Sequence, residues 1–419
     1  MTGGVETTAA TSVSGGGDAP FAWSSREPEL MTGFPPSLDV RVTPRNFRDP
    51  AAMKWLQLNT RSIGLTAPIL RAADAPSPLP QGVKEDLEAL VLDDPGGGAM
   101  TVAEWMNVTR TDAMLVMREG SIVYERYRHG VTADTPHAIW SITKSFAGAI
   151  AAMMANEGSL DLSRKAQDYV SELTGSGFGE ATVQQLLDMT TGDDYGENIA
   201  KDSPHVLNHT RTFFPNSMPP DEDAPKTLYE LLPMIGRLHP PGEIFSYNTA
   251  DTEALAWIIQ RVAGKHLATL ISERFWRPLG AEHDASILVD SVGMPVAGAG
   301  MSVTLRDLAR FGQMLCDEGR FAGRTIVPAD VIADLLRGGD REAFARGGGD
   351  ATRPGYSYRN YWWVDHRAGS IEAKGGSGQH LYVNPAARTV IVKFSAAVDP
   401  STTFSAHIDR PAFAAIVRG

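Results

Sequence analysis

The alternation of apolar and polar residues predicts strands near the two ends of the chain and helices between them. Residues 113–117, an apolar run, and residues 121–126 flank Arg-Glu-Gly, so they are predicted to form a β-hairpin. Residues 379–383 and 389–395 flank Asn-Pro-Ala-Ala and predict a second hairpin. Apolar positions recur at helical spacing in four segments between the hairpins, at 141–157, 182–189, 250–262 and 305–317.

The first hundred residues lack such a pattern. Residues 1–20 are rich in Gly, Ser, Thr and Ala, which is typical of a flexible terminus. Residues 21–104 are expected to wrap over the main body as an arm, because prolines interrupt the chain up to Pro80 and no period is sustained. Within this arm, the apolar positions of residues 82–92 predict one helix.

This order of elements favours one antiparallel sheet built from N- and C-terminal parts, with helices packed on it. Residues 105–419 are then expected to form a single domain of the α/β (α+β) class, with a mostly helical subdomain inserted at about 145–300. No internal repeat is present.

Composition narrows the class of partner. An apolar fraction of 42% with 21% charged residues is that of an ordinary globular protein. The net charge of −12 and the absence of Lys/Arg runs argue against a nucleic-acid partner, and no apolar stretch has the length of a membrane span. The first twenty residues do not resemble a signal peptide, so we expect a cytoplasmic location. The single cysteine, Cys316, excludes an intrachain disulfide and is expected to be a buried structural thiol.

The first candidate chemistry is the tetrad Ser141-Ile142-Thr143-Lys144, which opens a long apolar helix. Side chains at i and i+3 of a helix share a face, so the amine of Lys144 can reach the hydroxyl of Ser141. A serine hydroxyl needs a group that takes its proton before it becomes a nucleophile, and a buried amine can serve. By itself the tetrad is equally compatible with a helix-cap serine and a surface lysine.

Two later segments could complete such a site. Gly242 leads into an extended stretch that places Tyr247 and Thr249 on one side, where a phenol could relay a proton. A Gly-rich run, Lys374-Gly375-Gly376-Ser377-Gly378, precedes the C-terminal hairpin, and a backbone N–H of Gly376 or Ser377 could complete an oxyanion hole with that of Ser141. A Tyr packed beside a turn and a flexible Gly turn are the ordinary alternatives.

A metal site is not predicted. His205 and His209 stand four apart, but Pro204 precedes them and no third ligand is in register. No Gly-rich phosphate loop follows a predicted strand, so we expect neither metal nor cofactor.

The order Ser-x-x-Lys, Tyr-x-Thr and a C-terminal Gly-rich strand resembles class C β-lactamases, D,D-peptidases and their esterase and amidase relatives. Over about residues 105–400 the chain most resembles 6-aminohexanoate-dimer hydrolases, the nylon-oligomer amidases. The segments that carry this resemblance are SITKSF, QQLLDMTTGDDY, FSYNTADTEALAWIIQRVAG, MSVTLRDLARFGQML and GGSGQHLYVNPAARTVIVKFS.

The resemblance implies a role for each matching residue. Ser141 matches the acylated serine, Lys144 its general base and Tyr247 the second proton carrier. Tyr195 matches a tyrosine on a mobile loop that covers the substrate, and Thr249 stands where lactamases have Asn. The fold implied is that of β-lactamases and penicillin-binding proteins.

Two departures bear on the substrate. Thr249 replaces Asn, and Lys374 is not clearly in register with the Lys-Thr-Gly cation that holds a lactam carboxylate, so we expect poor penicillin turnover. Asp193 and Asp194, beside Tyr195, could attract a substrate ammonium, although a solvated acidic turn explains them equally well.

We therefore predict a serine hydrolase that cleaves linear amides resembling 6-aminohexanoate oligomers, or esters, through an acyl-enzyme. The alternatives are a carboxylesterase or an acyltransferase on the same scaffold. A β-lactamase or D,D-peptidase and a non-catalytic ligand-binding protein rank below these. The expected partner is a small-molecule amide or ester, with no nucleic acid or membrane, and a homodimer is one assembly open to test.

Overall fold

The computed structural model describes residues 29–47, 49–93, 98–197, 203–397 and 402–419, with the side chains of 93 and 402–407 left aside. Its helices are α1 (Pro50–Asn59), α2 (Val102–Val108), α3 (Thr143–Asn156), α4 (Ala166–Tyr169), α5 (Val183–Leu187), α6 (Pro204–Phe213), α7 (Leu228–Leu231), α8 (Ala250–Ala263), α9 (Leu267–Ile271), α10 (Leu305–Cys316), α11 (Ala329–Arg337), α12 (Arg341–Arg346), α13 (Gly349–Thr352) and α14 (Thr402–Arg418).

The strands form one large antiparallel sheet and three smaller sheets. The large sheet has the order β11 (Tyr356–Arg359), β12 (Trp362–Asp365), β13 (Ser370–Gly375), β14 (Gln379–Asn384), β15 (Thr389–Ser395), β4 (Thr111–Arg118) and β5 (Ser121–Tyr127). The second sheet has the order β1 (Thr66–Ile69), β7 (Ala285–Leu288), β8 (Met301–Val303) and β6 (His137–Ala138). Two-stranded sheets pair β2 (Val91–Asp93) with β3 (Ala99–Thr101), and β9 (Arg320–Phe321) with β10 (Arg324–Thr325).

The large sheet confirms the predicted joining of N- and C-terminal strands, because β15 pairs with β4 in antiparallel register. Both predicted hairpins are present as β4–β5 and β14–β15. At the first hairpin Glu119 and Gly120 both have positive φ, of 47° and 75°, as expected for a tight turn that matches the strand twist.

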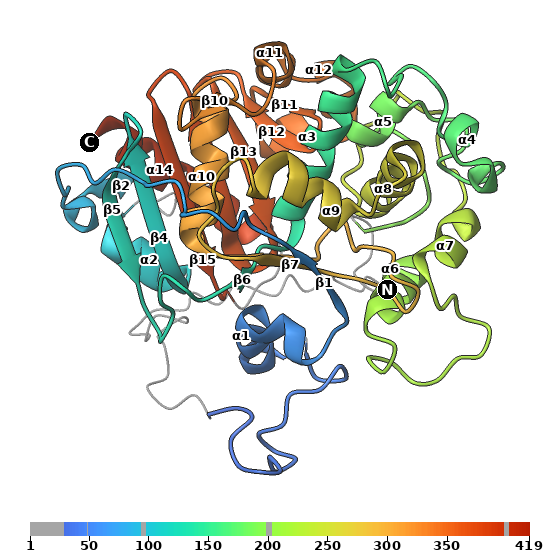
Figure 1. Cartoon of the computed structure of the whole chain (residues 1–419), viewed down its shortest axis with the longest axis horizontal. Coiled ribbons are helices and arrows are strands. Elements are labelled where there is room, and N and C mark those ends of the chain that lie inside the picture. The colour runs from blue at the N-terminus through green and yellow to red at the C-terminus, as the bar shows by residue number, and fades with distance from the viewer. Residues whose placement is uncertain (1–28, 48, 94–97, 198–202, 398–401) are drawn as a thin grey trace, which may run out of the picture.

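Each face of the large sheet packs on its own core. Along β4 the alternate residues Ala113, Leu115 and Met117 join the core under α3 and α10, whereas Met114 and Val116 join a second core under α2 and α14. Figure 1 shows the helices α4 to α9 gathered on the right of the sheet.

The predicted helices of the middle region are confirmed with small shifts of their ends. The segment at 141–157 is a short 3₁₀ turn, η3 (Trp140–Ile142), followed by α3. Thr182 and Gln185 form a capping box at α5, and Thr304 caps α10 by accepting the N–H of Asp307. Helix α8 ends at Gly264 in the left-handed region, with φ of 62°.

The predicted helix at 82–92 is wrong. The chain there runs beside β5: the N–H of Gly82 donates to the carbonyl of Ile122, and that of Glu85 donates to the carbonyl of Val123. A short 3₁₀ turn, η2 (Leu87–Ala89), and strand β2 follow. Hydrogen bonds to an existing strand edge therefore override the local apolar spacing.

Ten of the helices described above were not predicted from the sequence, among them α1, α11 and α14. Helix α1 lies inside the arm and begins at Pro50, a residue suited to a first helical turn. Helix α11 follows Pro328, and α14 covers the second core through Ala412, Phe413 and Ile416. The prediction for residues 1–20 lies outside the described residues.

Candidate active site

The tetrad at the start of α3 brings its two side chains together. Ser141 lies in the turn η3, which leaves it partly exposed, and Lys144 lies in the first turn of α3 with only 1% of its surface exposed. The Nζ atom of Lys144 is 2.9 Å from the Oγ atom of Ser141. A buried amine therefore contacts the hydroxyl of a partly exposed serine.

Lys144 has two further oxygen partners from distant parts of the chain. Its Nζ atom is 3.0 Å from the Oγ1 atom of Thr249, at the start of α8, and 2.6 Å from the carbonyl oxygen of Gly298. A Cβ atom at position 298 would lie 2.2 Å from the Cγ2 atom of Thr249, so only glycine allows the 298 carbonyl to come this close. The three contacts hold the amine from three sides.

Tyr247 lies beside the same amine. The Nζ atom of Lys144 is 5.2 Å from the centroid of the Tyr247 ring. The ring stacks on Trp363 with centroids 5.9 Å apart and meets the edge of Tyr358 at 6.1 Å. Packing on these two aromatic residues fixes where the phenol stands, and the residue remains partly exposed.

The Gly-rich run passes close to the segment that carries Ser141. A Cβ atom at Gly375, the last residue of β13, would lie 2.2 Å from the carbonyl oxygen of Ile139. The run then turns through η7 (Gly376–Gly378), where Ser377 has φ of 59°. Gly376 is partly exposed, whereas Gly375, Ser377 and Gly378 are buried.

Lys374 does not face this site. In the sheet Lys374 pairs with His380, His380 pairs with Lys393, and Lys393 pairs with Met114. Paired residues point to the same face, and Met114 belongs to the core under α14, so the side chain of Lys374 lies on that face. There its Nζ atom pairs with Glu372 at 2.7 Å. Burial lowers the pKa of Lys374 to about 8. The structure thus settles the register of the third motif: its lysine lies behind the sheet, where it cannot hold a substrate carboxylate.

The acidic loop after α5 has both structural and exposed carboxylates. The carboxylate of Asp193 accepts hydrogen bonds from the Thr191 hydroxyl, the Asn248 amide and the backbone N–H of Tyr195, at 2.6 to 2.9 Å. Burial raises the pKa of Asp193. Asp194 is exposed. Asp193 therefore shapes the loop, and Asp194 is the carboxylate that solvent reaches.

Tyr195 is buried, with 2% of its surface exposed. Its hydroxyl oxygen lies 2.6 Å from the Nδ1 atom of His209, on α6. No group of three or more possible metal ligands occurs among the residues that the structure describes.

Sequence reasoning missed two carboxylates around Lys144. Glu197 accepts hydrogen bonds from the backbone N–H and the hydroxyl of Thr249, at 2.6 and 3.1 Å. Glu253, in α8, is fully buried and accepts the N–H groups of Ala297 and Gly298. The only sequence signal for Glu253 is that it is a charged residue within the apolar pattern of 250–262. No feature of the sequence marks Glu197 as part of the site.

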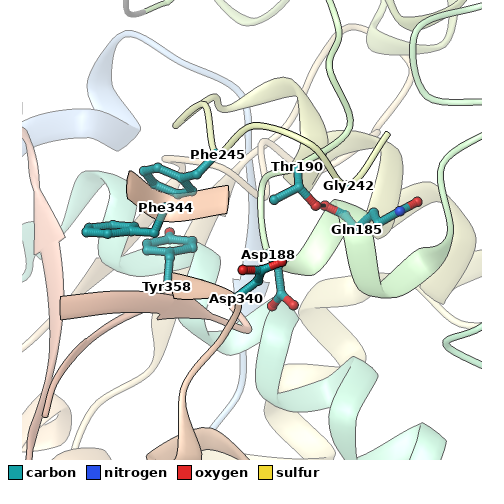
Figure 2. Close-up of a pocket in the computed structure, with 8 residues that line it drawn as sticks. All are labelled: Gln185, Asp188, Thr190, Gly242, Phe245, Asp340, Phe344 and Tyr358. Atoms are coloured by element: carbon teal, nitrogen blue, oxygen red, sulfur yellow. Dashed lines mark hydrogen bonds between the residues drawn. The ribbon is translucent and has the colours of Figure 1, made fainter. Parts of the chain in front are cut away.

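A pocket of about 240 Å³ lies next to the aromatic residues around Tyr247. Figure 2 shows Phe245, Phe344 and Tyr358 grouped on one side of it, with Gln185, Thr190 and Gly242 on the other. The carboxylates of Asp188 and Asp340 also line it, but they are engaged elsewhere, with Arg359 at 2.9 Å and with the first N–H groups of α12. Ser141, Lys144 and Tyr247 do not line this pocket, so it is separate from the reacting groups.

Comparison with known proteins is consistent with this geometry. The model of the Beta-lactamase family matches residues 101–415. A 6-aminohexanoate-dimer hydrolase of Paenarthrobacter ureafaciens is 32% identical over 379 residues, which cover 90% of this chain and 92% of that protein. No described helix has the length and apolar character needed to cross a membrane.

Solved structures show the same fold. The "Putative 6-aminohexanoate-dimer hydrolase from Bacillus anthracis" superposes with a TM-score of 0.81 at 33% identity, covering 91% of this chain and 98% of that one. A family VIII carboxylesterase superposes with a TM-score of 0.53 at 17% identity, covering 72% and 92%, and shows the fold alone. The chain belongs to the Beta-lactamase family and, within it, is similar to 6-aminohexanoate-dimer hydrolases.

Proposed function

We propose that this protein is a serine hydrolase that cleaves linear amide or ester bonds through an acyl-enzyme on Ser141. The observation that carries the proposal is the 2.9 Å contact between the Nζ atom of buried Lys144 and the Oγ atom of partly exposed Ser141. A nucleophile within hydrogen-bond reach of its base, at a helix start open to solvent, is the arrangement that acyl transfer requires.

The reaction follows from these positions. Lys144, with Tyr247 beside it, accepts the proton of the Ser141 hydroxyl while the Oγ atom of Ser141 attacks the carbonyl carbon of the substrate. The oxyanion is held by the backbone N–H groups of Ser141 and Gly376; we prefer Gly376 to Ser377 because it is the partly exposed residue of the run. Collapse returns the proton to the leaving amine or alcohol through Tyr247. Water, activated by the same groups, then releases the acid and restores Ser141.

A linear substrate is favoured over a lactam. Lys374 lies behind the sheet with Glu372, so it offers no charge to a lactam carboxylate. Thr249 uses its hydroxyl on Lys144 and Glu197, so it offers no amide to a lactam side chain. The similarity to the Paenarthrobacter enzyme points to amides of the 6-aminohexanoate type.

The loop around Tyr195 is proposed to bind the substrate. Exposed Asp194 is our candidate for contact with a substrate ammonium, while the carboxylate of Asp193 is occupied by hydrogen bonds within the loop. Tyr195 is buried against His209, so a direct contact with substrate requires this loop to move.

Covalent labelling tests the nucleophile. A fluorophosphonate probe should attach once per chain, seen as the added mass of one probe group. Ser141→Ala should abolish labelling and leave less than about 1% of hydrolysis. Ser145→Ala is the matched control, since Ser145 lies in the same helix with its hydroxyl on the carbonyl of Tyr361. Labelling that persists in Ser141→Ala would refute the assignment.

Relative kcat/KM values test the substrate class. The 6-aminohexanoate dimer, a p-nitrophenyl ester of a short acid and nitrocefin should be compared in one buffer. Nitrocefin as the best substrate would contradict the proposal. An active ester with an inert amide would indicate the esterase alternative, and product formed with an added alcohol or amine in place of water would indicate an acyltransferase.

A further inference from the structure

The neutral form of Lys144 has a geometric requirement that its neighbours meet. A neutral amine has two N–H bonds and one lone pair, and the lone pair must point at Ser141 for the lysine to accept its proton. The Nζ atom has three oxygen neighbours: Ser141, Thr249 and Gly298. If Thr249 and Gly298 both accept, the two N–H bonds are used and the lone pair is left facing Ser141.

Glu197 determines whether Thr249 can accept. A threonine hydroxyl can donate or accept, and its direction depends on its other partner. A carboxylate only accepts, and the Oε1 atom of Glu197 lies 3.1 Å from the Oγ1 atom of Thr249. The hydroxyl hydrogen therefore goes to Glu197, which leaves an oxygen lone pair of Thr249 for Lys144. The second Glu197 oxygen accepts the Thr249 N–H at 2.6 Å and holds the carboxylate in place.

Glu253 fixes the other acceptor. Its two carboxylate oxygens accept the N–H groups of Ala297 and Gly298, at 2.8 and 3.0 Å. Two bonds from one buried carboxylate hold consecutive peptide groups of this turn and so fix the direction of the Gly298 carbonyl, whose oxygen lies 2.6 Å from Lys144. The Nε2 atom of His209 lies 3.2 Å from the Oε1 atom of Glu253, and its Nδ1 atom lies 2.6 Å from the hydroxyl oxygen of Tyr195, so the His209 ring lies between Glu253 and the loop of Tyr195.

We propose that Glu197 and Glu253 are positioning residues that aim the lone pair of Lys144 at Ser141, one through the Thr249 hydroxyl and the other through the Gly298 carbonyl. The inference rests on the proposed function, in which Lys144 is the base. Neither carboxylate contacts Ser141 in the structure: each acts through one acceptor of the amine. Glu197 belongs to the same loop as Tyr195 and accepts hydrogen bonds from Thr249, and Tyr195 contacts His209, which lies beside Glu253. The position of the loop is therefore coupled to both acceptors of Lys144.

Isosteric variants test this on acylation alone. In Glu197→Gln the new amide N–H competes with Lys144 for the Thr249 oxygen, and in Glu253→Gln one of the two backbone N–H groups loses its acceptor. The maximal rate of Ser141 labelling by a fluorophosphonate should fall at least about tenfold in each, while the probe concentration for half-maximal rate stays the same. Asp251→Asn is the matched control, because Asp251 is equally buried in α8 but contacts Asn248 and not the acceptors of Lys144.

A second pair of variants leaves both carboxylates in place. Thr249→Ser keeps the hydroxyl and should label close to the natural rate, whereas Thr249→Val has the same shape, cannot accept, and should be slowed at least about tenfold. Equal rates for Ser and Val at this position, or natural rates in folded Glu197→Gln and Glu253→Gln, would overturn the inference. If the natural protein itself is not labelled on Ser141, the proposed function fails first, and that result is separate from any comparison among variants.

Discussion

Two buried lysines on opposite faces of one sheet have opposite surroundings. Lys144 is held by neutral oxygens from a serine, a threonine and a backbone carbonyl, and the serine reaches solvent. Lys374 is equally buried, but its partner is the carboxylate of Glu372. Burial alone therefore does not distinguish Lys144, our proposed base, from Lys374; the neutral partners of Lys144, one of them the partly exposed Ser141, do.

The surroundings of Lys374 are a network of charges between the sheet and α14. His380 lies 3.3 Å from Asp409, and Lys393 lies 3.4 Å from the same residue. Asp409 also accepts the indole N–H of Trp105 at 2.9 Å. Such a network costs desolvation free energy that its internal contacts must offset, so its members act on stability. On the other face, the hydrogen-bond partners of Lys144 among the described residues are neutral oxygens.

The largest effect is expected behind the sheet. Lys374→Met leaves Glu372 buried without its partner and should lower the free energy of unfolding by about 3–5 kcal/mol, measured by chemical denaturation. Glu372→Gln added to Lys374→Met removes the unpaired charge and keeps an acceptor for the Tyr356 hydroxyl, so the double variant should be more stable than Lys374→Met. A double variant less stable than the single one would show that the pair does not act as a unit.

At the catalytic face the effect should be on rate. Lys144→Ala should slow acylation at least about a hundredfold, equivalent to about 3 kcal/mol, because the serine loses its proton acceptor. Folded Lys374→Met should acylate close to the natural rate, which makes it the matched control for loss of a buried lysine. Similar losses of rate in both variants would remove the distinction between the two faces.

Tyr247→Phe tests whether the phenol shares the proton path of Lys144. We expect a loss of about a hundredfold in acylation rate. Combined with Lys144→Ala, the loss should be far smaller than the product of the two, because both groups handle one proton. Multiplicative losses, in a stopped-flow burst assay, would mean that one of the two residues has only a packing role.

The smallest effect, taken per unit of pH, is a pH dependence of stability behind the sheet. Burial lowers the pKa of Lys374 from 10.5 to about 8 in the folded protein, so between these values the unfolded chain binds more protons. The contribution of Lys374 to stability should therefore rise with pH, by at most ~1.4 kcal/mol per pH unit, from about pH 8 to about pH 10. The free energy of unfolding of the natural protein minus that of Lys374→Met isolates this slope. A flat or falling difference would contradict it.

Several elements were predictable because their signals are local. The hairpin at Glu119-Gly120, the capping box of α5 and the Thr304 cap of α10 depend on residues within a few positions of one another. The reach of Lys144 to Ser141 is also local, since both lie one turn apart. The strand order at the centre of the sheet followed from the two terminal hairpins.

Other features depended on contacts that no local pattern carries. The segment at 82–92 was mistaken for a helix because its hydrogen bonds go to β5. Helix α14 was missed, although with α2 it packs over one face of the sheet. The carboxylates of Glu197 and Glu253 gain their place at the site only when the loop and α8 pack against Thr249 and Gly298.

The sequence by itself determined which groups could react: a serine and a lysine one helical turn apart, a tyrosine after a glycine turn, and a Gly-rich strand. Only the tertiary structure decided what surrounds them. Lys144 finds its acceptors 105 and 154 residues further along the chain. Lys374 falls behind the sheet because neighbouring strand residues point to opposite faces, so a shift of one position reverses the side on which a charge is buried. Spacing along a helix is read locally, whereas sheet register and long-range packing are set only when the whole chain folds.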